Sequence, residues 1–182
     1  MWQYIRQILQ LVLSPTRGWE DISEASVPPD EIQRKGFYPW IGITALSEFA
    51  PLFYDSGRTV FMAFEMAIAV AGAMFAACFI ARIVMGMTLG AHVDGTLNLT
   101  KVNTLALYMI GVAGLFQIIA NIVPATLTVI HFLPLISLLI VFKAIPYMGV
   151  RQDNAMSFLL LAGIATIAIP MALTGLLSLI VM

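Results

Sequence analysis

From residue 37 onward, the chain consists of long apolar runs separated by short polar breaks. An α-helix rises about 1.5 Å per residue, so about 20 apolar residues are needed to cross a hydrocarbon core of about 30 Å. The runs predict five membrane-spanning helices, at residues 37–54, 59–89, 102–122, 125–143 and 156–182. The pattern therefore predicts an all-α polytopic membrane protein with five transmembrane helices.

The run at residues 102–142 decides how many spans there are. Its 41 residues contain no Asp, Glu, Lys or Arg. As a single helix they would extend about 61 Å, roughly twice the thickness of the hydrocarbon core. Asn121 and Pro124 are residues typical of a turn. We therefore expect this run to fold back on itself as two spans.

Basic residues divide unequally between the two sides of such a bundle. If the N-terminus is cytoplasmic, only Arg58 lies on the outer side. The basic residues on the inner side are then Arg6, Arg17, Arg34, Lys35, Arg82, Lys101, Lys143 and Arg151. This distribution follows the positive-inside rule. It predicts a cytoplasmic N-terminus and an external C-terminus.

The first 36 residues have a different pattern from the rest of the chain. One helical face would carry Trp2, Ile5, Leu9 and Val12, and the opposite face Gln3, Arg6, Gln7 and Gln10. This arrangement is typical of an amphipathic helix that lies in the headgroup plane. Pro15 and Pro29 predict two further helix starts, and Gly36 predicts a stop. We expect residues 1–36 to form a cytoplasmic and interfacial region beside a transmembrane domain at 37–182.

Composition agrees with a membrane protein. The chain is 60% hydrophobic and 10% charged, with a mean hydropathy of +0.95, whereas soluble domains carry about 25% charged residues. The net charge of −1 provides no electrostatic basis for binding nucleic acid. Trp2, Trp19 and Trp40 are expected to anchor the chain at the membrane interface. The single cysteine, Cys78, cannot form a disulfide within the chain.

Four polar residues interrupt the predicted spans at a common depth. Glu48, Glu65 and His131 each lie six residues from the outer end of a span, and Gln117 lies six residues before Val123 at the predicted turn, which corresponds to a depth of about 9 Å. Asn121 lies near the same level. Polar groups are costly in a bilayer and usually face the interior of a helix bundle. We therefore expect these side chains to form one buried polar layer.

Three hypotheses account for this layer, and a fourth alternative is that these side chains do not meet at all. In the first, each glutamate is protonated and donates a hydrogen bond that locks one helix to another. In the second, Glu48, Glu65 and His131 bind a divalent metal ion, because oxygen and nitrogen donors suit zinc or manganese. In the third, the acids relay protons or couple to a transported ion. A divalent cation is the only cofactor that any of them requires.

The sequence contains no common catalytic signature. It has no G-x-S-x-G, H-E-x-x-H, P-loop or C-x-x-C motif. We therefore expect no enzymatic activity.

Two further patterns concern packing and partners. Ala69, Ala73 and Ala77 form a stripe of small residues that lets helices approach closely, either within one protomer or in a homo-oligomer. Acidic residues of the N-terminal region form either a solvated helix face or a docking surface for a protein partner. They are Glu20, Asp21 and Glu24.

Three short stretches resemble a known family. SPTRGWEDI at 14–22, GFYPWIGITAL at 36–46 and PYMGVRQ at 146–152 are similar to prokaryotic members of the Yip domain (Ypt/Rab-interacting protein) family. The resemblance extends over essentially the whole chain. For short prokaryotic members it implies five spans and a cytoplasmic N-terminus, here in a bacterial inner membrane.

The same resemblance suggests a class of function. Eukaryotic members of the family are associated with Rab-type GTPases and with vesicle traffic or membrane shaping. This chain has no Asp-Leu-x-Gly-Pro motif of the kind found in those members. The resemblance implies a non-enzymatic, membrane-organising or trafficking-like scaffold. An ion- or proton-translocating protein that uses the buried polar layer is the alternative.

Overall fold

The structure is a computed structural model that describes residues 1–92, 96–123 and 133–181. In chain order, its α-helices are α1 (Trp2–Leu13), α2 (Pro15–Ala25), α3 (Pro29–Ile32), α4 (Tyr38–Leu46), α5 (Val60–Thr88), α6 (Leu99–Ile122), α7 (Leu133–Lys143), α8 (Ile145–Met148), α9 (Ala155–Gly163) and α10 (Ile169–Val181). Short 3₁₀ helices cover Ser47–Phe53, Leu89–His92 and Gln152–Asn154, and π-helical turns cover Gln33–Phe37 and Ile164–Ala168. Every regular element in the described part of the chain is helical.

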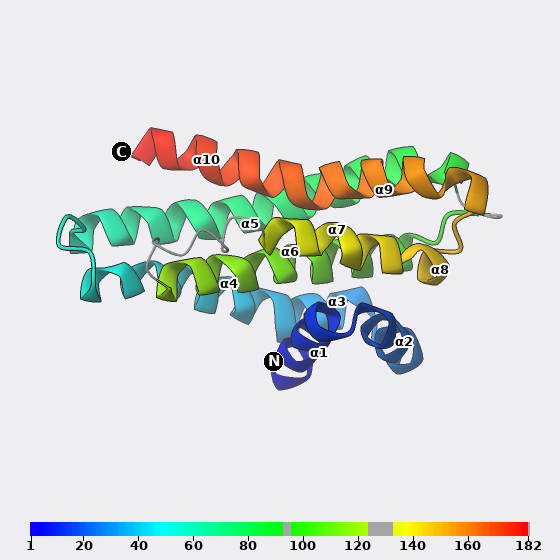
Figure 1. Ribbon diagram of the computed structural model, residues 1–182, viewed down its shortest axis with the longest axis horizontal. Coiled ribbons are helices and arrows are strands. Elements are labelled where there is room, and N and C mark those ends of the chain that lie inside the picture. The colour runs from blue at the N-terminus through cyan, green and yellow to red at the C-terminus, as the bar shows by residue number, and fades with distance from the viewer. Residues whose placement is uncertain (93–95, 124–132, 182) are drawn as a thin grey trace.

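Three helical segments are long and apolar enough to cross a membrane. They are Val60–His92, Leu99–Ile122 and Gln152–Leu179, with 33, 24 and 28 residues. These segments and the α3–α4 segment run side by side along the long axis, whereas α1 and α2 lie against one side of the bundle (Figure 1). The described part of the chain is therefore all-α, with three helices that could span a bilayer.

The other two predicted spans take a different form. Residues 37–54 belong to a helical stretch in which the nine-residue helix α4 passes directly into the 3₁₀ helix Ser47–Phe53. The predicted span at 125–143 contains α7, which has 11 residues. Residues 124–132, including His131, lie outside the described part of the chain. Neither α4 nor the described part of α7 alone reaches the roughly 20 residues that a span requires, but α4 belongs to a continuous helical stretch from Pro29 to Phe53.

Two prolines inside helices are each preceded by a π-helical turn. The π-helical turn Gln33–Phe37 ends two residues before Pro39, and the π-helical turn Ile164–Ala168 ends two residues before Pro170. Proline has no N–H group, and its ring collides with the carbonyl four residues earlier in a regular helix. A π-turn widens the helix locally. The chain therefore stays helical through both prolines.

The prediction that Gly36 ends a helix is wrong. The helical stretch that begins at Pro29 continues through Gly36 into α4. A Cβ atom at this position would lie 2.6 Å from Cγ of Tyr4, which is too close for any side chain. Gly36 is thus needed for the approach of α1, and its role is in tertiary packing.

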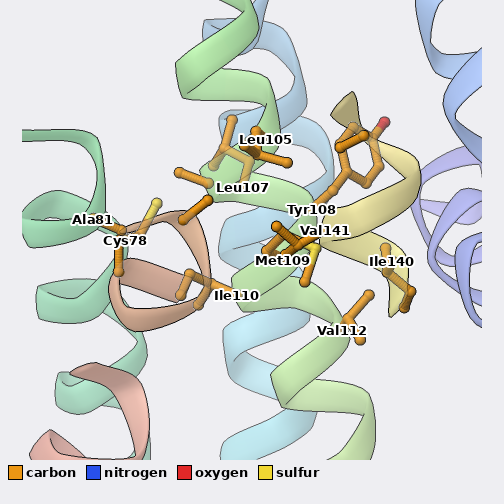
Figure 2. Close-up of a cluster of buried hydrophobic side chains, with 14 of the residues drawn as sticks. Cys78, Ala81, Leu105, Leu107, Tyr108, Met109, Ile110, Val112, Ile140 and Val141 are labelled. Carbon is orange, nitrogen blue, oxygen red and sulfur yellow. The ribbon is translucent and has the colours of Figure 1, made fainter. Parts of the chain in front are cut away.

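Helix α6 is the centre of the bundle. Every residue from 104 to 112 is buried, and a helix that is apolar on all sides is expected to be surrounded by protein. Figure 2 shows several of these side chains around α6, with Cys78 and Ala81 of α5 on one side and Ile140 and Val141 of α7 on another. The α6 residues labelled there are Leu105, Leu107, Tyr108, Met109, Ile110 and Val112. α6 is therefore the element on which the other helices assemble.

Helix α5 has two distinct faces. Phe64, Phe75 and Phe79 are exposed at helical spacing and form an outward-facing apolar stripe. Ala69 and Ala73 are buried, and α10 packs along α5. This arrangement favours small-residue packing within one protomer.

Helices α1 and α2 form an N-terminal cap that is fastened to α6 and α7. The Tyr4 hydroxyl donates to the Leu107 carbonyl at 2.7 Å, and the Trp19 indole Nε1 donates to the Ile140 carbonyl at 2.9 Å. Both bonds are buried. Residues 1–36 are thus packed onto the bundle.

Three of the predictions for aromatic and polar positions are wrong. Gln7, expected on a solvated face, is buried and accepts a hydrogen bond from the Tyr108 hydroxyl at 2.5 Å. Trp19 and Trp40, expected as interface anchors, are buried core residues. The Trp40 indole donates to the carbonyl of Gly111 at 2.9 Å. Each of these polar groups finds its partner on α6 or α7, so burial costs little.

Candidate functional site

A carboxylate is buried where α4 gives way to a 3₁₀ helix. Glu48 lies in the segment Ser47–Phe53, and its side chain is 1% exposed. This segment packs against α6 and α5. Burying a carboxylate is costly unless it is paired and hydrogen-bonded, so the surroundings of Glu48 define the candidate site.

Two side-chain amides of α6 reach the same oxygen of Glu48. Gln117 Nε2 and Asn121 Nδ2 each donate to Oε1 at 2.8 Å. Residues four apart on a helix lie on one face, one turn above the other. The spacing of Gln117 and Asn121 therefore presents both amides to one carboxylate.

Arg58 completes the Glu48 cluster. Its guanidinium Nη2 lies 3.4 Å from Oε2 of Glu48, and its side chain is 23% exposed. Thr59 accepts a hydrogen bond from the amide N of Met62 and thereby caps α5. The turn between the two helices thus directs Arg58 back toward the acid. We call Glu48, Gln117, Asn121, Ser47 and Arg58 the Glu48 cluster.

Further hydrogen bonds hold the cluster in place. Asn121 Nδ2 also donates to Ser47 Oγ at 2.9 Å, and Ser47 Oγ donates to the Thr44 carbonyl at 2.6 Å. The Tyr54 hydroxyl donates to the backbone carbonyl of Asn121 at 2.7 Å. The 3₁₀ segment is therefore tied to the end of α6 at several points.

Both oxygens of the Glu48 carboxyl group accept hydrogen bonds from other side chains of the chain. Gln117, Asn121 and Arg58 all donate, so Glu48 accepts every one of these bonds. In the lock hypothesis the glutamate was expected to donate. The helices are joined as that hypothesis expects, but with the direction of the hydrogen bonds reversed.

The other members of the predicted polar layer are placed differently. Glu65 lies on α5 nine residues before Met74, which faces Gly114 of α6. Nine residues are two and a half helical turns, so Glu65 projects from the opposite side of α5. Its side chain makes no hydrogen bond or ion pair with any residue that the structure describes. His131 lies outside the described residues.

A metal site is not formed by the residues that the structure describes. Among residues 1–92, 96–123 and 133–181, no group of three or more His, Cys, Asp and Glu side chains is arranged to hold a metal ion. Glu48 is the one acidic member of its cluster, and each of its oxygens already has a partner. Nothing in this geometry requires a cation.

Sequence reasoning missed Arg58, Ser47 and Tyr54 as members of this site. A signal for Arg58 was present, because it is the one basic residue assigned to the outer side and follows Glu48 by ten residues across a turn. No comparable pattern marked Ser47 or Tyr54. Their roles depend on the approach of Asn121 from α6.

Comparison with known proteins adds no identity to these observations. No protein-family model, curated protein or solved structure matches the chain. The fold therefore defines a class, an all-α protein with helices long and apolar enough to cross a membrane.

Proposed function

We propose that the protein is a non-enzymatic integral membrane protein that organises its membrane through lipid and protein contacts, as its resemblance to the Yip domain family suggests. In this proposal the chain crosses a bacterial inner membrane five times, with the N-terminus in the cytoplasm. The Glu48 cluster serves as a structural lock near the outer surface. The N-terminal cap supplies the working surface.

The observation that carries this proposal is the division of α1 into three sides. Tyr4 lies on the side buried against α6. A second side is apolar and exposed, with Trp2 78% and Leu13 84% accessible. The third side exposes Gln3 and Arg6. A helix that lies at the membrane surface needs these three environments: bundle, hydrocarbon and water.

Helix α2 contrasts with α1 in its exposed surface. Its buried residues, Trp19 and Ile22, face the bundle. Its exposed side carries Thr16, Arg17, Glu20, Asp21, Ser23, Glu24 and Ala25. This side suits water or a protein partner. The cap thus holds α1 as a fixed amphipathic wedge in one leaflet, with α2 on the aqueous side of it.

Reconstitution into liposomes tests the wedge. We expect the wild-type protein to reduce vesicle diameter or to form tubules, observed by cryo-electron microscopy, as the protein-to-lipid ratio rises. The double substitution Leu9→Gln/Leu13→Gln should remove most of this effect, because it makes the exposed apolar side of α1 polar. Leu99→Gln changes an exposed leucine outside the cap and serves as the control. Wild-type vesicles identical to protein-free vesicles would rule out membrane shaping.

Ion or proton translocation is the alternative. It requires a carboxylate that is free to exchange its partners, whereas Glu48 is held by two amides and a guanidinium. A pH-gradient flux assay in the same liposomes distinguishes the two functions. A proton flux above that of empty vesicles that is lost in Glu48→Gln would favour translocation over the scaffold.

A further inference from the structure

A cavity lies between α5, α6 and α10, and Gln117, which binds Glu48, is one of the residues that line it. Its volume is about 420 Å³, within the range of small-molecule sites. The residues around it include Met74 of α5, Ala113 and Gln117 of α6, Thr166 of the π-helical turn, and Met171 and Thr174 of α10. Met171 is exposed, so the cavity reaches the apolar outer surface of the bundle. A molecule dissolved in the bilayer could enter from that side.

Three hydroxyl groups at the cavity already donate their hydrogens to backbone carbonyls. Thr166 donates to the Ala162 carbonyl at 2.7 Å, Thr174 to the Pro170 carbonyl at 3.0 Å, and Ser178 to the Gly175 carbonyl at 2.8 Å. A hydroxyl has one donor and two acceptor lone pairs. Each of these groups can therefore offer the cavity only an acceptor.

Gln117 has the same one-sided character. Its Nε2 donates to Glu48 at 2.8 Å and to Oδ1 of Asn121 at 3.4 Å, which uses both N–H bonds. Its Oε1 accepts no hydrogen bond from any residue that the structure describes. The carboxylate behind it thus orients the amide so that the oxygen is left for the cavity. Ser137 adds one further hydroxyl, which can accept or donate.

Charge selects against an acidic ligand. None of the described residues that line the cavity is basic, and the nearest charged group through Gln117 is the carboxylate of Glu48. A phosphate or carboxylate headgroup would meet mainly lone pairs, because the Ser137 hydroxyl is the one group among the described lining side chains that could still donate to it. The wall that is left is apolar, with acceptors placed along it.

We propose that this cavity binds an apolar, membrane-soluble molecule that carries a neutral hydrogen-bond donor, namely a long-chain alcohol of lipid or isoprenoid type. The chain lies against Met74, Ala113 and Met171, and the hydroxyl donates to the oxygen of Gln117 or Thr174. This site is separate from the surface of α1 on which the scaffold function rests.

Photolabelling in phospholipid nanodiscs tests the proposal. Three diazirine probes of equal chain length are compared: an alcohol, the corresponding alkane and the corresponding fatty acid. We expect the alcohol probe to label cavity residues about tenfold more strongly than the alkane or the fatty acid probe. One or two hydrogen bonds are enough for a tenfold difference in binding. Labelled residues are identified by mass spectrometry.

Two variants examine the shape and the chemistry separately. Ala113→Phe should fill the cavity and abolish labelling by the alcohol. Thr174→Val keeps the shape but removes an acceptor, and should reduce labelling about threefold to tenfold. Phe79→Leu, on the exposed face of α5, is the control and should leave labelling unchanged. Size-exclusion profiles and melting temperatures show that each variant is folded.

Each remaining outcome overturns the proposal. Equal labelling by the three probes would show a gap filled by any acyl chain. Preferential labelling by the fatty acid would show that the acceptors do not select the ligand. Labelling in wild type that persists at full strength in folded Ala113→Phe would place the probe elsewhere.

Discussion

The N-terminal cap and the Glu48 cluster both fasten a peripheral element to the central helices, but they do so by different chemistry. In the cap, neutral donors on Tyr4 and Trp19 reach backbone carbonyls of α6 and α7. In the Glu48 cluster, a carboxylate receives two side-chain amides and a guanidinium. The cap is held mainly by side-chain donors on backbone carbonyls, with Gln7 and Tyr108 as a side-chain pair, whereas Glu48 itself is held only by other side chains.

This difference determines what each region requires of the sequence. A backbone carbonyl is present whatever residue occupies the position, so the cap depends mainly on close approach, as at Gly111 and Gly36. The Glu48 cluster depends on the identity of every partner. A charge that is left buried without partners costs more than a lost neutral hydrogen bond. We therefore expect the largest single effects in the Glu48 cluster.

Replacing Glu48 provides the strongest test. Glu48→Leu leaves Gln117, Asn121 and Arg58 without their common acceptor, and should reduce the unfolding free energy by about 3 kcal/mol. The measurement is SDS-induced unfolding of the purified protein in mixed micelles. Glu65→Leu is the matched control, because Glu65 is half-buried and has no hydrogen-bond partner among the described residues. Equal losses for both variants would contradict the distinction between the two acids.

The cap should respond to steric change at α6. A Cβ atom at Gly111 would overlap the Tyr4 hydroxyl and lie 2.8 Å from Cδ1 of Ile8. Gly111→Val should displace α1 and destabilise the protein by about 2 kcal/mol. Amide hydrogen exchange in α1 should accelerate. Gly42→Ala, where an added Cβ meets nothing within 4 Å, should leave exchange in α1 unchanged.

Alkaline pH should weaken the cap through Tyr4. Burial, together with the nearby Tyr108, raises the pKa of Tyr4 well above its usual value of about 10. The unfolded chain therefore loses this proton at a lower pH than the folded protein does. The stabilisation that the protonated Tyr4 hydroxyl gives to the folded protein is fully present below about pH 10. It declines as the pH rises toward the folded pKa, and the unfolding free energy then falls by up to about 1.4 kcal/mol per pH unit.

Tyr4→Phe isolates that contribution. It should cost about 1 kcal/mol at neutral pH, because the bond to the Leu107 carbonyl is lost. It should also flatten the decline in unfolding free energy between pH 9 and 11, measured with the same SDS titration. An unchanged decline in the variant would assign the alkaline sensitivity to another group.

The smallest effect is expected at the surface of the α3 region. The hydrogen bond and charge of Lys35 lower the pKa of Glu31, and their ion pair, at 2.7 Å, is solvent-exposed. Exposed pairs of this kind contribute little to stability. Glu31→Gln should leave the melting temperature unchanged within error at neutral pH. A clear loss would mean that Glu31 supports the cap.

Much of the helical framework was predictable from the sequence. Helices begin at Pro15 and Pro29 as expected, because proline is suited to a first helical turn. The apolar runs also predicted the long helices α5 and α6, since length and composition are local properties. The resemblance to the Yip domain family and the orientation in the membrane stay predictions.

The site was predictable only in part. The sequence predicted a common depth for Glu48 and Gln117, and in the structure Gln117 Nε2 donates to Glu48 Oε1 at 2.8 Å. The depth of Glu65 also predicted that its side chain would join this polar layer. In the structure, the Glu65 side chain projects from the side of α5 that faces away from α6. Depth along a helix follows from counting residues, whereas the direction of a side chain depends on which face the neighbouring helix covers.

The sequence by itself determined that this chain is helical and apolar, and roughly where its helices begin. Only the tertiary structure decided which polar residues are partnered: that Gln7, Trp19 and Trp40 are core residues, and that Arg58 folds back onto Glu48. The reason is physical. Helix formation depends on residues within a few turns, but the burial of a polar group depends on donors and acceptors that lie far away in the chain, such as Ile140 for Trp19.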